Sequence, residues 1–537
     1  MMLLFSAVAL CTVTTTSAEP LHTQIDRLIQ RQATGPFAAK STDSEFLRRI
    51  YLDLAGQIPT VAETRNFLKS DHPDKRTILI DQLLEDPRYA RRMAELFNVI
   101  LLERRGVDET WHRFLTTSFS ENVPWTVMVQ RMIQPDLEDP NQQGAGFFLT
   151  KRLEKYGQNP TDYPGLASDI GRLFLGMDLA CAQCHDHLFV DAYKQRDFQG
   201  LYAFVSNTFI RTDLEFPAIG QRVMKSPLEF QSVFEEVAFS TGPRIPGQTE
   251  LMVPEHVAAD EFAIAPNKET KAPGVPAFNP LNFLSTQLPV PENQAFNRNI
   301  VNRLWFVMMG KGLVEPLDLH HPDNPPTHPA LLDLLAAEFV EHQYDLKWLL
   351  RELSLSETYQ RSSITKGDTA AIRTAMSEYR VFGEKPISAE QLMWSLLTAT
   401  NMTAAYPQES ADPDQDNPLP TTLDAVRTQF LEAFANPPRE PEGSFAPSIR
   451  GALFLLNSEL VLHWVTMQPG NLASELNALE SASAIADKLY ITILSRRPSA
   501  GETDHITAYL DKSTDKPQAV SQIIWALLAS NEFMINH

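Results

Sequence analysis

The sequence of 537 residues predicts a mainly α-helical protein built from two multi-helix domains. Apolar residues recur at helical spacing along most of the chain, and capping residues precede many of these segments. The periodicity is lost in two intervals that are both rich in proline. Hydrophobic residues make up 43% of the chain and charged residues 21%, so the chain can bury a sizeable interior, and its length exceeds that of one core.

The first 18 residues are expected to be a secretory signal peptide. Residues 1–18 carry no charge, residues 2–10 are mostly apolar, and Ser17-Ala18 offers a small-residue cleavage site. The apolar run is too short for a membrane span. We therefore expect an exported protein, periplasmic or at the cell surface, with no membrane span after signal cleavage. The net charge of -21 argues against a nucleic-acid partner, because phosphates would be repelled.

Residues 19–240 form consecutive amphipathic helices in this prediction. An apolar helix face that includes Phe46 and Leu54 runs up to Gly56, which is a typical helix stop. Thr60 and Glu63 then stand at capping-box spacing and open the next helix. Residues 161–180 form a further helical stretch that leads into the cysteine motif described below.

The remaining boundaries follow from proline. Residues 241–281 contain seven prolines and are expected to be a linker or a small irregular region with a few short strands. Residues 282–537 form the second helical domain. Within it, residues 404–447 are rich in proline and acidic residues, which predicts a long loop.

A pattern near the start of the chain is repeated near its end. Tyr51, Pro59, Thr60 and Glu63 reappear at a constant offset as Tyr490, Pro498, Ser499 and Glu502. Two interpretations are open. Either two helical hairpins share the common rules of helix capping, or a module has been duplicated.

The cysteines point to a cofactor. Of three cysteines, Cys11 lies in the expected signal peptide, and the other two lie in Cys181-Ala182-Gln183-Cys184-His185. Two thiols at this spacing followed by histidine are typical of c-type haem attachment. Cys181 and Cys184 would form the thioethers, and His185 would be the proximal iron ligand. The alternatives are a structural disulfide with no cofactor, a redox-active cysteine pair, or a zinc or iron site that includes His187.

The other iron ligand stays open at this point. Met177 is close in sequence and is expected on the proximal side, whereas Met308, Met309 and His328 are candidates by residue type alone. Aromatic residues after the motif could line a flat cofactor, although core packing is their usual role. They are Phe189, Tyr193, Phe198, Tyr202 and Phe204.

Several motifs resemble a known family. Residues 46–54, the following Gly56 and Pro59-Thr60, and residues 181–187 resemble the planctomycete cytochrome-like domain family. Segments of the second half resemble the domain of unknown function that usually accompanies it. They are residues 301–305, 310–316, 324–329, 388–392 and 455–458. The resemblance implies an exported protein with a haem motif, and a link to polysaccharide breakdown.

The chain also departs from this family. Leu319-His320-His321 stands where members tend to have Asp-Phe-Arg, and members often carry arginine at the position of Lys385 or Pro386.

A cluster of polar residues in the second half is a candidate second site. Its members are Asn302, Arg303, Asp318, Asn324 and His328. The alternative is that these side chains cap helices and satisfy the backbone of a buried loop.

The favoured function is that of a monohaem electron-transfer or redox-accessory protein whose redox partner the sequence does not identify. One alternative is a helical interaction or scaffold protein with a structural cysteine pair. The other is a metal-dependent hydrolase that uses the Cys/His cluster and His328. We do not favour an enzyme, because the sequence contains no recognisable nucleophile–base pair, phosphate loop or paired-histidine zinc helix.

Overall fold

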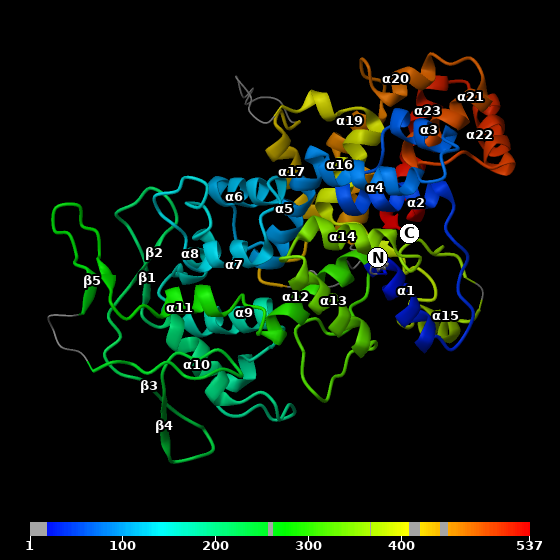
Figure 1. Cartoon of the computed structure of the whole chain (residues 1–537). Helices are drawn as coiled ribbons and strands as arrows, with labels where there is room; N and C mark the ends of the chain where they lie inside the picture. Colours follow the sequence, from blue (N-terminus) through cyan, green and yellow to red (C-terminus); the bar gives the residue numbers. More distant parts are fainter. Residues whose placement is uncertain (1–18, 256–260, 366, 408–418, 441–448) are drawn as a thin grey trace, which may run out of the picture.

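Helices dominate the computed structural model of the chain, as the periodicity predicts (Figure 1). It describes residues 19–255, 261–365, 367–407, 419–440 and 449–537. The expected signal peptide, residues 1–18, lies outside them. None of the helices in these ranges has the length and apolar character needed to cross a membrane.

The first part of the chain is helical up to residue 205. Its α-helices are α1 (Leu21–Gln32), α2 (Asp43–Ile50), α3 (Val61–Lys69), α4 (Lys75–Glu85), α5 (Pro87–Leu102), α6 (Glu109–Ser120), α7 (Trp125–Ile133), α8 (Phe147–Leu153), α9 (Tyr163–Leu175) and α10 (Gln195–Val205). Two further turns are the π-helix η1 (Tyr51–Ala55) and the 3-10 helix η2 (Ala180–Gln183). η1 ends at Gly56 with φ 70°, and the Thr60–Glu63 capping box forms in full. Both signals were predicted from the sequence.

Short antiparallel hairpins follow. They are formed by β1 (Thr208–Ile210) with β2 (Ile219–Gln221), β3 (Leu228–Gln231) with β4 (Ala238–Thr241), and β5 (Phe262–Ile264) with β6 (Val275–Pro276). The prediction of short strands in residues 241–281 is confirmed by the third pair. The first pair, and all of the second except Thr241, lie before this interval, within residues expected to be helical.

The second part returns to helix. Its elements are α11 (Pro280–Gln287), α12 (Gln294–Met309), α13 (Pro329–Glu341), α14 (Leu346–Leu355), α15 (Thr369–Ser377), β7 (Lys385–Pro386), α16 (Ala389–Thr400), η4 (Thr403–Ala405), α17 (Leu423–Phe434), α18 (Ile449–Asn457), α19 (Glu459–Val465), α20 (Leu472–Asn477), α21 (Ala482–Ile493), α22 (Ala500–Lys512), α23 (Lys516–Leu528), α24 (Asn531–Met534) and β8 (Ile535–Asn536). Strands β7 and β8 pair, which joins the middle of the second part to the end of the chain.

One prediction for this part is wrong. Residues 404–447 were expected to be a long loop, but they contain α17. Thr422 caps this helix by accepting a hydrogen bond from the backbone N–H of Ala425. Leu423, Val426 and Phe430 follow at spacings of three and four and are buried. The surrounding prolines conceal this short apolar stripe in the sequence.

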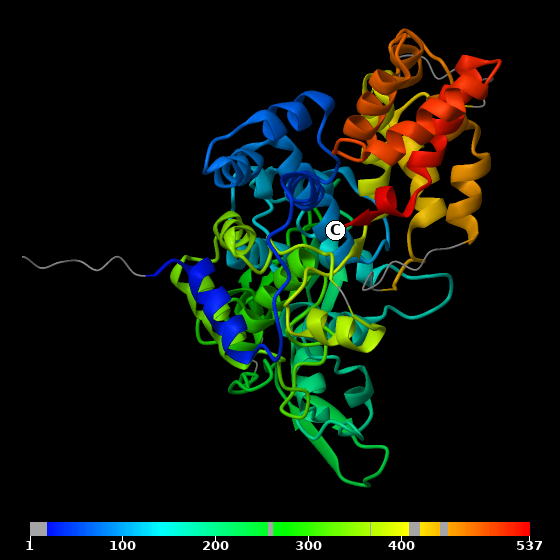
Figure 2. The same ribbon diagram turned by 90° about the vertical axis from the view of Figure 1, so that its right-hand side faces the viewer.

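Two hydrophobic cores hold the fold together. The larger core takes side chains from Leu21 to Phe382, on both sides of the proline-rich interval. The smaller core runs from Ile387 to Phe533, and it also includes Leu52 and Ile58 from the N-terminal part. In Figure 2 the C-terminal helices (orange and red) gather at one end of the molecule, and the β3–β4 hairpin (green) extends at the other.

Candidate functional site

The cysteine segment begins where α9 ends. Gly176 adopts the left-handed conformation with φ 68°, and a Cβ atom there would lie 2.7 Å from the side chain of His320. The chain then continues into η2, so the helical stretch predicted for residues 161–180 ends before the motif. Cys181 and Cys184 are exposed, and neither forms a disulfide. The motif is therefore a short surface turn with two accessible thiols.

The backbone of this turn is held from two sides. Gln195 and Gln199 of α10 donate side-chain hydrogen bonds to the carbonyl oxygen of Gln183, at 3.3 Å and 2.8 Å. The backbone N–H of Val233, between β3 and β4, donates to the carbonyl oxygen of Cys184 at 3.0 Å. The side chain of Ala182 is fully buried beneath the turn. The thiols are thus presented by a fixed backbone.

His185 is oriented by its own neighbour. Its Nδ1 lies 2.6 Å from the carbonyl oxygen of Asp186, and because a carbonyl only accepts, Nδ1 carries the hydrogen. The neutral ring then has its free lone pair on Nε2. The ring also packs on Phe234, with ring centroids 4.9 Å apart. The imidazole is therefore positioned with one nitrogen suited to bind a metal.

His187 has a different role. Its Nδ1 accepts hydrogen bonds from the backbone N–H groups of Phe189 and Val190, at 3.2 Å and 3.0 Å. Its ring meets the edge of Tyr193, with centroids 5.9 Å apart. His187 thus organises the turn after the motif, and its Nδ1 lone pair is already engaged. Asp186, the residue between the two histidines, is exposed and accepts from the N–H of Gln195 at 2.9 Å.

Large apolar side chains around the motif are exposed. Phe189 is 87% exposed, Phe234 69%, Val233 66% and Leu188 63%. Phe189 is one of five aromatic residues that the sequence offers as the lining of a flat cofactor. Of those, Tyr193, Phe198 and Phe204 are buried in the larger core and Tyr202 is partly buried against it. Exposed apolar side chains that lie close together are a feature of surfaces that bind a partner or a ligand.

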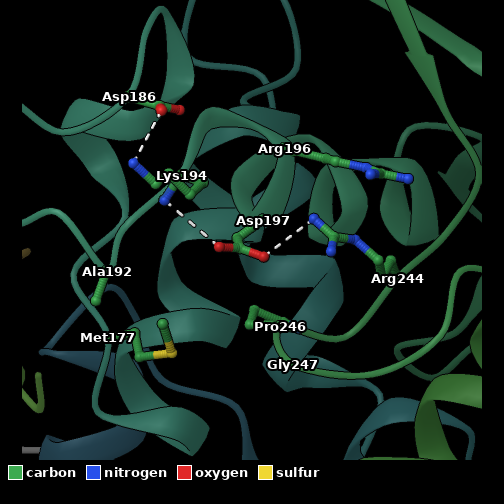
Figure 3. Close-up of a pocket in the computed structure, with 9 residues that line it drawn as sticks. All are labelled: Met177, Asp186, Ala192, Lys194, Arg196, Asp197, Arg244, Pro246 and Gly247. Carbon is green, nitrogen blue, oxygen red and sulfur yellow. Dashed lines mark hydrogen bonds and ion pairs between the residues drawn. The ribbon is translucent and has the colours of Figure 1, made fainter.

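A cavity of about 670 Å³ opens beside the motif (Figure 3). Met177 and Asp186 line it together with three basic side chains, all of which are paired. Lys194 pairs with Asp186 at 3.1 Å, Arg244 with Asp197 at 3.0 Å, and Arg196 with Glu250 at 2.9 Å.

The other candidate iron ligands lie in the second part of the chain. Met308 and Met309 are buried at the end of α12, where the carbonyl of Met308 accepts from Lys385. His328 is buried against Tyr379, with ring centroids 5.3 Å apart. Within the described ranges, no group of three or more His, Cys, Asp or Glu side chains forms an arrangement that could hold a metal ion.

Part of the predicted second site belongs to a buried ionic cluster. Arg303 of α12 pairs with Asp318, and Asp318 also pairs with Arg172 of α9 at 3.2 Å. Arg172 in turn pairs with Asp169 at 3.0 Å and with Glu103 at 2.6 Å. The cluster therefore ties α12 to α9, the helix that leads to the cysteine motif.

Two pKa values in or beside the cluster are shifted. Burial alone would raise the pKa of Asp169, but the charges of Arg152, Arg172 and Arg105 outweigh it and lower the pKa to about 2. Burial, followed by the charge of Arg303, lowers the pKa of His320 to about 4. His320 also accepts a hydrogen bond at its carbonyl oxygen from the hydroxyl of Tyr193, at 3.1 Å.

Two of the three remaining candidates of the second site, Asn302 and Asn324, satisfy the backbone. Asn302 exchanges two hydrogen bonds of 3.0 Å with the backbone of Val314. Asn324 donates to the carbonyl oxygens of Glu315 and Leu319, at 3.2 Å and 2.8 Å. His328 lies apart, next to Tyr379. The contacts of Asn302 and Asn324 are those expected of residues that hold a buried loop.

A second buried cluster was not identified from the sequence. Lys385 pairs with Asp53 of η1 at 2.7 Å, and Asn536 of β8 donates to the same carboxylate at 2.8 Å. The hydroxyl of Tyr359 donates to the other oxygen of Asp53, also at 2.8 Å. The available signal was an aspartate between Leu52 and Leu54 on an apolar helix face. The cluster joins the N-terminal part to the end of the chain.

The fold and the site define a mainly α-helical protein in which an exposed Cys-x-x-Cys-His turn lies beside a β-hairpin. Comparison with protein families agrees with the predicted pair of domains. Residues 24–209 match the family described as PSCyt2, a protein of unknown function (DUF1549), and residues 283–510 match PSD1, a protein of unknown function (DUF1553). No curated protein and no solved structure matches the chain. The cysteine motif falls within the first match, and β3 and β4 fall between the two.

Proposed function

We propose that this protein carries one c-type haem, covalently attached through Cys181 and Cys184, and that it acts as an exported electron-transfer or redox-accessory protein. The observation that carries the proposal is the hydrogen bond from Nδ1 of His185 to the carbonyl of Asp186. Histidine ligands of metals commonly donate their second ring N–H in this way, which fixes the tautomer and the ring orientation. Nε2 of His185 would then be free to bind the iron.

The surroundings of the motif support the same group. Both thiols are free and exposed, as an attachment reaction requires. Each thioether would form by addition of S–H across a vinyl group, so no atom leaves. A flat apolar molecule bound here would shield the exposed rings of Phe189 and Phe234 from water. When bound, the haem would supply one-electron exchange between ferric and ferrous iron.

Expression of the mature chain in a periplasm that contains a cytochrome c maturation system tests the proposal. We expect haem staining of the protein band on a denaturing gel, a Soret band, and an intact mass increased by one haem. The matched control is the double variant Cys181→Ser/Cys184→Ser, which should fold and carry no covalent haem.

An intact mass that is two hydrogens below that of the reduced chain, with no haem stain, would overturn the proposal. It would indicate a Cys181–Cys184 disulfide and favour the interaction or scaffold alternative. A control cytochrome c loaded in the same cells shows that the maturation system works.

A further inference from the structure

The β3–β4 hairpin extends away from the helical body at the end opposite to the C-terminal helices (Figures 1 and 2). The apolar side chains near its tip face solvent. Val233 is 66% exposed and Val237 60%. Such side chains are costly to expose unless something covers them.

The hairpin is also joined to the cysteine motif. The N–H of Val233 bonds the carbonyl of Cys184 at 3.0 Å, and Phe234 packs on the ring of His185. Gln195 of α10 donates to the carbonyl of Gln231 at 3.2 Å, which anchors the end of β3. The tip of the hairpin and the two thiols therefore form one continuous surface.

This surface is acidic. Residues 226–242 contain Glu229, Glu235 and Glu236, and residues 176–193 contain three aspartates. The basic side chains of Lys194, Arg196 and Arg244 beside them are each paired with a carboxylate. Five of the six carboxylates lie on exposed residues, and Lys194 pairs with one of them, Asp186. We name the surface formed by residues 181–191 and 229–239 the hairpin face. It has exposed apolar side chains with carboxylates around them.

We infer that the hairpin face is the docking surface for an electropositive electron-transfer protein. The inference rests on the proposed function. Lysine and arginine side chains of the partner would meet the carboxylates, which speeds the encounter and orients it, and the apolar side chains would be desolvated at the centre. The attachment turn at Cys184 lies within this surface, so docking there brings the partner close to the iron centre.

Charge selects this partner over the other occupants. A second copy of the chain, with a net charge of -21, would be repelled. Anionic lipids and nucleic acids would be repelled by the same carboxylates. Residues 181–191 of the hairpin face lie within the first family match, and residues 229–239 lie between the two matches.

Stopped-flow electron transfer tests the inference. The holoprotein is first checked by haem stain and spectrum, so a failure of the proposed function is seen before the docking experiment begins. The probe is a mitochondrial cytochrome c, a small basic haem protein, and a neutral quinol serves as a second donor. The variant is Glu235→Lys/Glu236→Lys. Its matched control, Asp504→Lys/Asp511→Lys on α22, makes the same change in net charge on exposed residues at the far end of the molecule.

For the wild type we expect a rate with cytochrome c that falls as ionic strength rises. The hairpin variant should be slower at low salt by about tenfold or more, with a weaker salt dependence, and the control variant should stay within about twofold of wild type. All three proteins should react with the quinol at the same rate.

Equal rates for the hairpin variant and the control would overturn the inference, since net charge alone would then account for the effect. A changed Soret band or a changed quinol rate in the hairpin variant would also overturn it. The hairpin would in that case act on the haem environment and not on a partner.

Discussion

The buried ion pair between Asp53 and Lys385 should contribute more to the free energy of unfolding than an exposed ion pair does. Their side chains are 3% and 12% exposed. Nζ of Lys385 donates to Asp53 and to the carbonyls of Val307 and Met308, at 2.8 Å and 2.9 Å. These carbonyls lie in the last turn of α12, where a positive charge is favourable. Lys385→Met removes the ammonium group at similar volume and leaves the carboxylate buried with only neutral donors.

The expected loss follows from that unpaired charge. Removing one partner of a buried pair costs about 3–5 kcal/mol, and Lys385→Met and Asp53→Asn should each fall in this range. The double variant removes both charges of the pair, so its loss should be smaller than the sum of the two single losses by about 1–3 kcal/mol. Lys385→Arg keeps the charge and should cost about 1 kcal/mol or less.

Urea unfolding followed by tryptophan fluorescence and far-UV circular dichroism measures these differences as shifts of the midpoint at constant m-value. Additive losses in the double variant would refute the reasoning, because the two side chains would then contribute independently. A loss for Lys385→Arg as large as that for Lys385→Met would also refute it, since packing and not charge would be responsible.

Two pH-dependent predictions follow from the ionic cluster. His320 has a pKa of about 4 in the folded state and about 6.5 when unfolded, so the unfolded chain binds the proton first and the free energy of unfolding falls as pH drops from about 6.5 to 4. In urea titrations His320→Asn should remove about 3 kcal/mol of this fall relative to wild type, and identical profiles for the two proteins would contradict the prediction. Asp169 has a folded pKa of about 2, below its unfolded value of about 3.9, so its stabilising effect is present above pH 4 and is lost as pH falls towards 2. The difference in stability between wild type and Asp169→Asn should therefore shrink by about 2 kcal/mol between pH 4 and 2, and a constant difference would exclude this origin.

Local rules of helix formation account for what the sequence predicts well. The left-handed Gly56 and the Thr60–Glu63 capping box depend on a few adjacent residues, so their patterns are readable without the fold. The Cys-x-x-Cys-His motif is local in the same sense, since three residues within one turn define it. The α17 helix was missed because its short apolar stripe lies between prolines.

Contacts between distant segments explain what the sequence does not predict. Asp53 and Lys385 are separated by 332 positions, and neither has a local pattern that indicates the other. The contact of Phe234 with His185 likewise depends on how the hairpin folds back on α10. The candidate second site contains both local contacts and contacts between distant segments. Arg303 and Asp318 pair directly, and Asp318 also pairs with Arg172, which lies in the first half of the chain.

The repeat at the two ends of the chain has the same ionic centre in each copy. In each, an arginine lies over the ring of the repeated tyrosine and pairs with the glutamate of the capping box. These residues are Tyr51, Glu63 and Arg88 in the first copy and Tyr490, Glu502 and Arg496 in the second. Capping rules explain the glutamates alone. The two arginines lie at different positions in the two copies. Arg88 is at the start of α5, and Arg496 is in the turn after α21. The same group of tyrosine, glutamate and arginine therefore occurs in both copies, with the arginine supplied by a different segment.

The relation between the copies favours duplication over shared capping rules. The element order η1, α3, α4, α5 is repeated as α21, α22, α23, α24. Arg48 and Asp487 stand at the same offset as the repeated tyrosines, and each bonds the opposite copy. Arg48 donates to the carbonyls of Ile493 and Phe533, at 3.2 Å and 2.8 Å, and Asp487 pairs with Arg65 at 3.3 Å. The two copies therefore contact each other, although Arg48 and Asp487 bond different parts of the opposite copy. Leu52 and Ile58 reach the smaller core beside α16, where Gln391 donates to the carbonyl of Leu52 at 2.7 Å and the N–H of Ile58 donates to Ser395 at 3.3 Å.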